Sequence, residues 1–216
     1  MFEALTTNFS KARMLPYING NEEFDRVLTQ YHANILLSEA MIPCLHYFEV
    51  CLRNCIDQVI QENYSKNWLV KPPYKLMISD KYIKKIEALL KMGEEKRKIQ
   101  THDDILAQMG FGFWCSFFQP KYDPILWHRK DALKNIFPNL SRIDRKRSQI
   151  EKKILKIKQI RNRIAHHEPI WDSMPLTYNT YVTCQELLRA MSIEITAMLK
   201  FIDRFPAVYK VSLDLK

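Results

Sequence analysis

The residues of this chain that could do chemistry gather where a long basic helix is expected to end, just before Pro169. Arg161 and Asn162 are followed about one helical turn later by His166 and His167. A guanidinium keeps its charge and binds phosphate oxygens, whereas a histidine exchanges a proton near neutral pH. An arginine, an asparagine and two histidines at one helix end therefore indicate a site that handles a phosphate ester.

The helix that carries this set has an apolar stripe of isoleucines at helical spacing: Ile150, Ile154, Ile157, Ile160 and Ile164. At about 100° per residue, Arg161 projects within about 20° of the start of the stripe. A guanidinium on an apolar face needs a carboxylate, a phosphate or a subunit interface as its partner. Two structural alternatives stand beside the chemical one. The arginine reaches solvent or forms a structural ion pair, and the histidines cap the helix.

A second polar set lies on an earlier helix, beside the apolar stripe of that helix. His46, Glu49, Arg53 and Asp57 share one face at three- and four-residue spacing. If this face packs against the helix of Arg161, Glu49 would orient Arg161 or Arg53. The alternative is a solvated polar flank, in which an i,i+4 pair contributes only a few tenths of a kcal/mol.

The composition predicts an all-α protein that carries excess positive charge. Lysine and arginine number 33 against 24 acidic residues, a net charge of +9, which favours a polyanion as partner: RNA, DNA or an acidic membrane face. Hydrophobic residues make up 47% of the chain, and only 4 glycines are present. We predict one all-helical domain over residues 21–205 with a smaller helical insertion at about 66–140. An N-terminal segment (1–20) precedes it and a C-terminal tail (206–216) follows it.

The positions that begin and end the helices follow from caps and prolines. Ser38 is a candidate N-cap, which would place Pro43 in the first turns, where proline is tolerated. Thr101 and Asp104 have the spacing of a capping box. The expected helices are at about 22–34, from Ser38 to about Tyr64, from Ser79 or Asp80 to Gly93, from Thr101, from Trp127 to Phe137, from Ser141 to about His167, and at about 178–204.

Other function classes lack their signatures. The 5 cysteines form no C-x-x-C pair, no signal sequence is visible, and no stretch approaches the roughly 20 apolar residues of a membrane span. These features predict a cytoplasmic protein without a membrane partner. No H-E-x-x-H, phosphate-binding glycine loop or dinucleotide glycine pattern occurs. We therefore expect neither a metal nor a cofactor.

Three segments resemble a known family. RNRIAHHEPIW (161–171) is similar to the R-x(4–6)-H motif of the HEPN superfamily in its R-N-x-x-x-H form, and resembles the Abi-like (abortive infection) family. LSEAMIPCLHYFEVCLRNCI (37–56) and MGFGFWCSFF (109–118) resemble blocks of that family in the same order. The resemblance covers roughly residues 25–200. It implies a helical bundle of the HEPN type with a smaller helical insertion.

The resemblance also implies an activity, that of a metal-independent endoribonuclease of the abortive-infection or toxin type in phage defence. His166 or His167 would take the proton from an RNA 2′-hydroxyl, and both satisfy the motif spacing. Arg161 would stabilise charge on the scissile phosphate, and Asn162 would position the phosphate or the histidine. The products would be a 2′,3′-cyclic phosphate and a 5′-hydroxyl.

The implied partners are RNA, a second copy of the chain that completes a composite site in a homodimer, and an antitoxin or phage-derived trigger. The residues expected to support the site or bind RNA are His46, Glu49, Arg53, Asn54, Arg163 and Glu168. The alternative function is a non-catalytic RNA-binding or regulatory helical module of a defence or toxin–antitoxin system. Substitution of Arg161 by alanine separates the two functions. If Arg161 is catalytic, the variant loses cleavage but still folds and still binds RNA.

Overall fold

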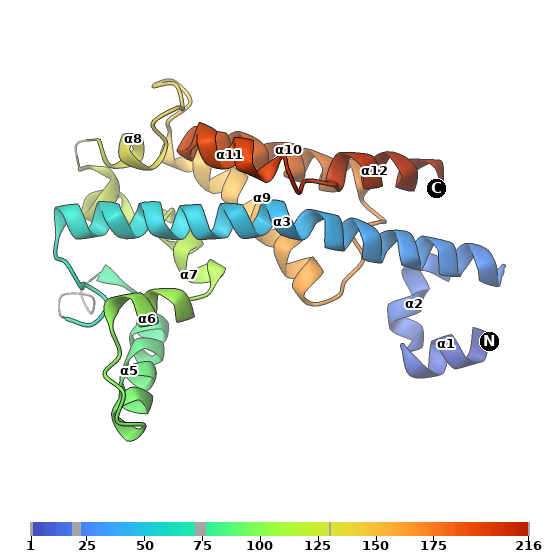
Figure 1. Ribbon diagram of the computed structural model, residues 1–216, viewed down its shortest axis with the longest axis horizontal. Coiled ribbons are helices and arrows are strands. Elements are labelled where there is room, and N and C mark those ends of the chain that lie inside the picture. The colour runs from blue at the N-terminus through green and yellow to red at the C-terminus, as the bar shows by residue number, and fades with distance from the viewer. Residues whose placement is uncertain (1, 19–22, 72–76, 130, 216) are drawn as a thin grey trace. The chain divides into compact units, whose positions relative to one another are not determined.

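The computed structural model describes residues 2–18, 23–71, 77–129 and 131–215, and its regular elements in these ranges are all helical (Figure 1). The all-α prediction is confirmed. The elements are α1 (Phe2–Asn8), α2 (Lys11–Ile18), α3 (Phe24–Asn63), α5 (Asp80–Glu95), α6 (His102–Gln108), α7 (Phe111–Ser116), the 3-10 turn η1 (Pro120–Tyr122), the π turn η2 (Asp123–Trp127), α8 (Ala132–Ile136), α9 (Arg147–Ala165), α10 (Met174–Met191), α11 (Ile193–Leu199) and α12 (Phe205–Asp214).

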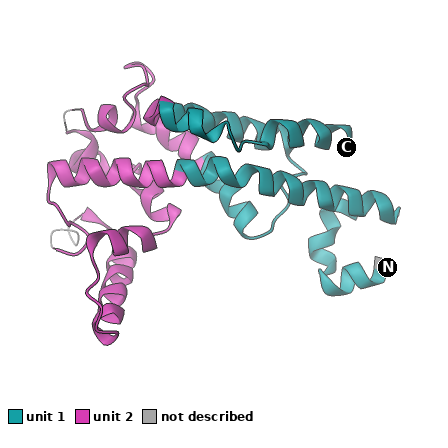
Figure 2. Ribbon diagram, viewed as in Figure 1, with its two compact units in different colours: residues 1–48, 156–189, 194–216 teal, residues 49–155, 190–193 magenta. Residues whose placement is uncertain are grey.

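The chain divides into two compact units (Figure 2). Unit 1 comprises Met1–Phe48, Lys156–Arg189 and Glu194–Lys216, and unit 2 comprises Glu49–Leu155 and Ala190–Ile193. Helices α3 and α9 each contribute one part to unit 1 and the other part to unit 2. The R-N-x-x-x-H segment lies in unit 1.

Unit 1 is built around the first part of α3, whose inward positions are apolar and buried: Val27, Ala33, Leu37, Ala40, Met41 and Cys44. The thiol of Cys184 on α10 lies 3.7 Å from the carbonyl oxygen of Cys44, so α10 packs against this face. Tyr181 of α10 stacks on Phe205 of α12 with ring centroids 4.5 Å apart, and its hydroxyl donates to Asp203 at 2.5 Å. Unit 1 thus places α10 and α12 around α3.

Helix α3 runs without a break for 40 residues, so the predicted boundary at Ser38 is wrong. Ser38 lies inside the helix, and Pro43 lies near its middle. An interior proline costs about 3 kcal/mol or more, because it removes a backbone hydrogen bond and crowds the preceding turn. The buried apolar face continues on both sides of Pro43, from Leu37 to Phe48, and its packing offsets this cost.

Helix α3 also bears on the membrane prediction. Among the described residues, α3 is the one helix that is long enough and apolar enough to cross a membrane. Of its most apolar 18-residue stretch, 39% is buried. The core helix of a soluble protein passes the same test, so this is weak evidence for a span. We expected no stretch that approaches the roughly 20 apolar residues of a membrane span, and α3 is a weak exception to that expectation.

The second basic helix is shorter than predicted at both ends. α9 begins at Arg147, whereas Ser141 closes a separate turn in which its hydroxyl accepts from the amide of Asp144 at 3.2 Å. At its other end α9 stops at Ala165, before the two histidines. Four of its isoleucines are fully buried as the stripe predicted, and Ile164 is half-buried.

The C-terminal helices differ from the predicted single helix at 178–204. α10 already begins at Met174, with Pro175 in its first turn, where the missing N–H is not needed. Ser192 separates α10 from α11. Helical residues also occupy the predicted N-terminal segment and C-terminal tail, in α1, α2 and α12.

Unit 2 packs an aromatic core of Trp68, Phe113, Trp114 and Phe117, all buried. The capping box is confirmed: the amide of Asp104 donates to the hydroxyl of Thr101 at 3.1 Å, and the amide of Thr101 donates back at 3.0 Å. Gly93 does not end its helix, since α5 continues to Glu95. A Cβ at Gly93 would lie 2.5 Å from Gln100 Cγ, so the glycine permits a close approach instead.

The helix predicted from Trp127 to Phe137 is also shorter in the structure. Trp127 ends the π turn η2, and α8 covers only Ala132–Ile136. Asp131, with φ of 63°, interrupts the helix at the start of α8. Position 130 of this prediction lies outside the described residues.

Candidate functional site

The R-N-x-x-x-H segment ends in a tight turn that closes helix α9. The amide of His167 donates to the carbonyl of Ile164 at 3.0 Å, and the amide of Glu168 donates to the carbonyl of Arg163 at 2.7 Å. His167 has φ of 57°, the left-handed conformation of a Schellman turn. Glycine usually fills this position, and a residue with a Cβ there costs about 1–2 kcal/mol. The predicted helix through His167 is therefore wrong by two residues.

The main chain of the following loop is held by side chains from α2, α3 and α10. Asn34 of α3 is buried, and its Oδ1 accepts from the amides of Ile170 at 2.7 Å and Trp171 at 3.1 Å. The hydroxyl of Thr177 donates to the carbonyl of Ile170 at 3.0 Å. Arg13 of α2 donates through Nη1 to the carbonyl of His167 at 2.6 Å. These bonds define the path of the loop after α9.

Arg163 binds the same loop from inside the motif. Its guanidinium donates to both carboxylate oxygens of Asp172, at 2.9 and 3.0 Å, and to the hydroxyl of Ser173 at 3.1 Å. It also donates to the carbonyl of Pro169. Arg163 was expected to support the site or bind RNA. Its contacts join the end of α9 to the start of α10, and its role at the site stays a prediction.

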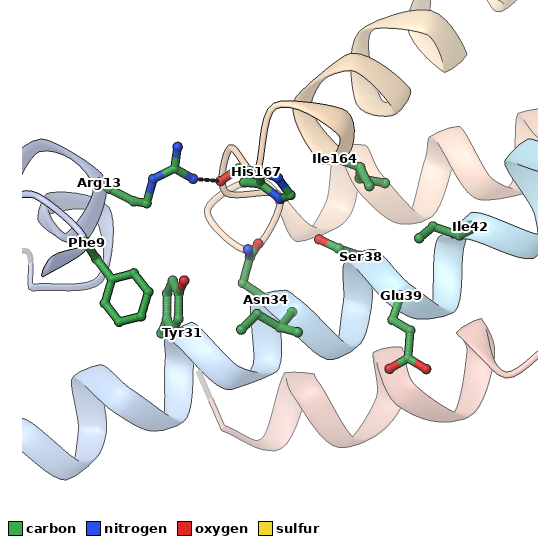
Figure 3. Close-up of a pocket in the computed structure, with 10 residues that line it drawn as sticks. Phe9, Arg13, Tyr31, Asn34, Ser38, Glu39, Ile42, Ile164 and His167 are labelled. Atoms are coloured by element: carbon green, nitrogen blue, oxygen red, sulfur yellow. Dashed lines mark hydrogen bonds between the residues drawn. The ribbon is translucent and has the colours of Figure 1, made fainter. Parts of the chain in front are cut away.

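The imidazole of His167 lines a pocket of about 540 Å³ in unit 1 (Figure 3). The other lining residues come from the segment between α1 and α2 and from α2, α3 and α9: Phe9, Arg13, Tyr31, Asn34, Ile35, Ser38, Glu39, Ile42 and Ile164. In Figure 3, Ser38, Glu39 and Ile42 follow one another along α3, and Arg13 reaches the loop from the side of α2. The pocket therefore combines a histidine, a guanidinium and an apolar wall.

Tyr17, which packs against Tyr31 of the pocket lining, is an uncharged phenol. Tyr17 of α2 is buried, and its ring meets that of Tyr31 edge-on, with centroids 5.3 Å apart. Burial is the main reason that the pKa of Tyr17 lies well above its ordinary value, and the nearby Tyr31 and Asp172 raise it further. Tyr17 thus stays a neutral phenol and packs the N-terminal helices against α3.

The remaining motif residues surround the same helix end. Arg161 is half-buried on the face that carries the fully buried Ile157 and Ile160, as the helical geometry predicted. Asn162 is half-buried, and its carbonyl accepts from the amide of His166 at 2.9 Å. His166, His167 and Glu168 are all exposed. The two histidines differ in that His167 is among the residues that line the pocket.

The second predicted set, on α3, is divided between the two units. His46 is exposed in unit 1, whereas Glu49, Arg53 and Asn54 belong to unit 2. Glu49 is half-buried, and Arg53 donates through Nε to Oδ1 of Asn54 at 3.2 Å. An orienting contact from Glu49 to Arg161 stays a prediction.

Asp57, on the same face of α3, has its own buried network in unit 2. Its carboxylate binds the indole N–H of Trp68 at 2.7 Å, Nε2 of His102 at 2.8 Å and the amide group of Gln61 at 2.6 Å. Burial by itself raises the pKa of Asp57. The hydrogen bonds from His102, Trp68 and Gln61 outweigh burial and hold the pKa below its ordinary value. Asp57 therefore stabilises unit 2 and takes no part in the pocket beside His167.

Reasoning from the sequence missed Phe9, Arg13, Tyr31, Asn34 and Thr177. Asn34 left a signal, because it is a polar residue seven positions after Val27 and three before Leu37, within a buried stripe. Arg13 left none, since its contact spans 154 residues of sequence. In the part of the chain that the structure describes, no group of three histidine, cysteine or acidic residues could hold a metal ion.

Comparison with known proteins gives one family. A family model described as Abi-like protein matches residues 2–172, from α1 to the loop after α9. The chain belongs to the Abi-like protein family. Membership of the Abi-like proteins suggests abortive infection, a form of phage defence. The match includes all three resembling segments and also α1 and α2, which the resemblance at 25–200 left out. Neither the curated proteins nor the solved structures contain a match to this Abi-like chain.

Proposed function

We propose that this Abi-like protein is a metal-independent endoribonuclease of the HEPN type that acts in phage defence. The observation that carries the proposal is the end of α9. There an arginine and an asparagine of α9 are followed by two histidines in the closing turn, and His167 lines a pocket together with Arg13. Family membership and the net charge of +9 support the same activity.

The reaction begins with proton transfer from the 2′-hydroxyl of RNA to a neutral imidazole of His166 or His167. The 2′-oxygen forms a bond to the adjacent phosphorus, and the bond from phosphorus to the 5′-oxygen breaks. The departing oxygen takes a proton from the imidazolium, so the products are a 2′,3′-cyclic phosphate and a 5′-hydroxyl. Arg161 stabilises the negative charge that develops on the phosphate oxygens, and Asn162 positions the phosphate or the histidine.

Both histidines are exposed, and a different observation favours each. The spacing R-N-x-x-x-H favours His166. The pocket selects His167, whose main chain is held by Arg13 and whose ring lines the pocket. Single substitutions decide between them, because loss of the proton acceptor removes cleavage whereas loss of its neighbour lowers it only partly.

The proposed partners are RNA, a second copy of the chain that completes the site, and an antitoxin or phage-derived trigger that controls it. The proposed location is the cytoplasm, where the RNA substrates of such a defence system are found. His46, Glu49, Arg53, Asn54 and Glu168 are proposed to support the site or contact RNA.

A second candidate is an RNA-binding or regulatory module without catalysis. The observation that favours it is the structural use of the motif: Arg163 binds Pro169, Asp172 and Ser173, and the main chain of His167 closes a helix. A motif retained for these contacts would keep the fold without cleaving RNA.

The deciding experiment is RNA cleavage in EDTA by the wild type and by Arg161→Ala, His166→Ala and His167→Ala, with analysis of the product ends. We expect cyclic-phosphate ends from the wild type, and loss of cleavage in Arg161→Ala and in one histidine variant. His128→Ala is the matched control, because this histidine is exposed and lies in unit 2. In cells, phage plating should rise in the inactive variants at equal protein level. RNA binding by all variants without cleavage by any would select the second candidate.

A further inference from the structure

The pocket beside His167 has one wall that is apolar yet open to solvent. Phe9 is 43% exposed, Ile35 is 47% exposed and Ile42 is 51% exposed. The ring centroids of Phe9, just after α1, and Tyr31 of α3 lie 5.5 Å apart, so the two residues together present an aromatic surface. The volume of about 540 Å³ lies within the range of about 300–1,000 Å³ that small-molecule pockets have. This wall suits a flat, partly apolar group.

The other wall carries positive charge. Arg13 is half-buried and lines the pocket, and its bond to the carbonyl of His167 uses one of the five N–H donors of a guanidinium. A guanidinium held in this way offers its other donors to an anion without a large loss of side-chain entropy. Glu39 is the acidic residue in the lining, and Arg204 pairs with it at 2.6 Å, so its charge is compensated.

We propose that this pocket binds one unpaired nucleotide of the RNA, with the base against Phe9 and Tyr31 and its phosphate on Arg13. The proposal rests on the proposed function for the choice of RNA as the ligand, and goes beyond it by assigning residues that no motif of the chain contains. Charge complementarity and an aromatic surface are the two features by which proteins bind single strands. A nucleotide held there lies beside His167, next to the bond to be cut.

The proposal selects single-stranded substrates. A base inside an A-form duplex is stacked and paired, so its face cannot reach Phe9 or Tyr31. An unpaired nucleotide exposes that face, and the aromatic wall accepts any of the four bases by stacking. Phe9, Arg13 and Tyr31 thus provide substrate selection, whereas the end of α9 provides the chemistry.

The first test measures binding apart from cleavage. The probe is a labelled single strand of about ten nucleotides in which 2′-fluoro groups replace every 2′-hydroxyl, so that the 2′-oxygen attack cannot occur. Phe9→Leu, which keeps apolar bulk but removes the ring, should weaken binding roughly 5- to 160-fold, the range found for loss of one stacked base. Phe9→Tyr should bind like the wild type. Leu15→Ala is the control, because Leu15 is 58% exposed on α2 and does not line the pocket.

The second test counts the phosphate contact through its salt dependence. Each phosphate neutralised on a single strand adds about 0.7 to the slope of log affinity against log salt. Arg13→Gln should therefore lower this slope by about 0.7, and Arg13→Lys should restore it. A purely structural arginine would change stability and leave the slope of the folded protein unchanged.

The outcomes separate this proposal from the nuclease proposal. If the wild type cleaves RNA but Phe9→Leu binds the probe normally and Arg13→Gln keeps the salt slope, the nucleotide pocket is refuted and the nuclease stands. If both variants lose affinity although no protein cleaves RNA, the pocket stands and the nuclease fails. If Phe9→Leu changes the oligomeric state in sedimentation velocity while probe binding is unchanged, the surface contacts a second copy and the proposal is overturned.

Discussion

Replacement of Asn34 by alanine tests whether a buried amide determines the position of the loop after α9. In the wild type, Oδ1 of Asn34 accepts from the amides of Ile170 and Trp171, and all three residues are at most 5% exposed. Alanine removes the acceptor and leaves two buried N–H groups without a partner. Each such group costs about 1–3 kcal/mol.

The net loss follows from these costs and from one opposing effect. Alanine has a higher helix propensity than asparagine, by about 0.5 kcal/mol, which offsets part of the loss. The free energy of unfolding should therefore fall by about 2–5 kcal/mol. Asn179→Ala on α10 is the matched control, since this asparagine is exposed and helical and should gain up to about 0.5 kcal/mol.

Urea unfolding gives the size of the effect, and amide hydrogen exchange gives its place. The amides of Ile170 and Trp171 should lose protection in Asn34→Ala, whereas amides in the unit 2 part of α3 should keep theirs. A variant within about 0.5 kcal/mol of the Asn179→Ala control, with Ile170 and Trp171 still protected, would refute the reasoning. If the nuclease proposal holds, the loosened loop should also lower cleavage.

Three further predictions concern the same elements and unit 2. His167→Gly should raise the free energy of unfolding by about 0.5–1 kcal/mol in urea, because glycine adopts the left-handed turn without a Cβ clash, and a loss instead would contradict a strained histidine. Arg163→Lys should lower the melting temperature, because one ammonium cannot replace bonds to Asp172, Ser173 and Pro169. An unchanged melting temperature would show that the Arg163 bonds do not stabilise the loop. The lowered pKa of Asp57 stabilises the fold above the ordinary value of 3.8, and this contribution is lost as pH falls through the folded pKa. Urea unfolding at about pH 6 and about pH 3 should therefore show a smaller pH dependence in Asp57→Asn than in the wild type, and equal dependence would refute the assignment.

The features that the sequence predicted well depend on local patterns. The isoleucine stripe of α9 and the capping box at Thr101 need only residues three or four positions apart, and both are confirmed. The all-α class followed from composition and periodicity in the same way. The placement of Arg161 on the isoleucine face also followed, because it depends on helical geometry alone.

The features that the sequence did not reveal depend on contacts between distant segments. Continuation of α3 through Pro43 depends on burial of its apolar face by other helices, which no local rule contains. The pocket needs Arg13 at His167 and Asn34 at Ile170, pairs that are 154 and 136 positions apart. The end of α9 was predicted two residues too late for a local reason. His167 adopts the left-handed conformation that usually requires glycine, so the sequence carried no glycine to mark the end of the helix.

The side chains that hold the loop after α9 bind main-chain atoms of its residues 167–171. Arg13, Asn34, Arg163 and Thr177 contact carbonyl oxygens or amide groups there, which every residue other than proline possesses in full. These contacts therefore do not depend on which side chains stand at positions 166 and 168, whereas the left-handed conformation at 167 favours glycine over a residue with a Cβ. Different side chains can be exchanged at positions 166 and 168 while these main-chain contacts are kept. The loop is thus a place where relatives can diverge in chemistry without refolding, and where a designer can install other catalytic groups.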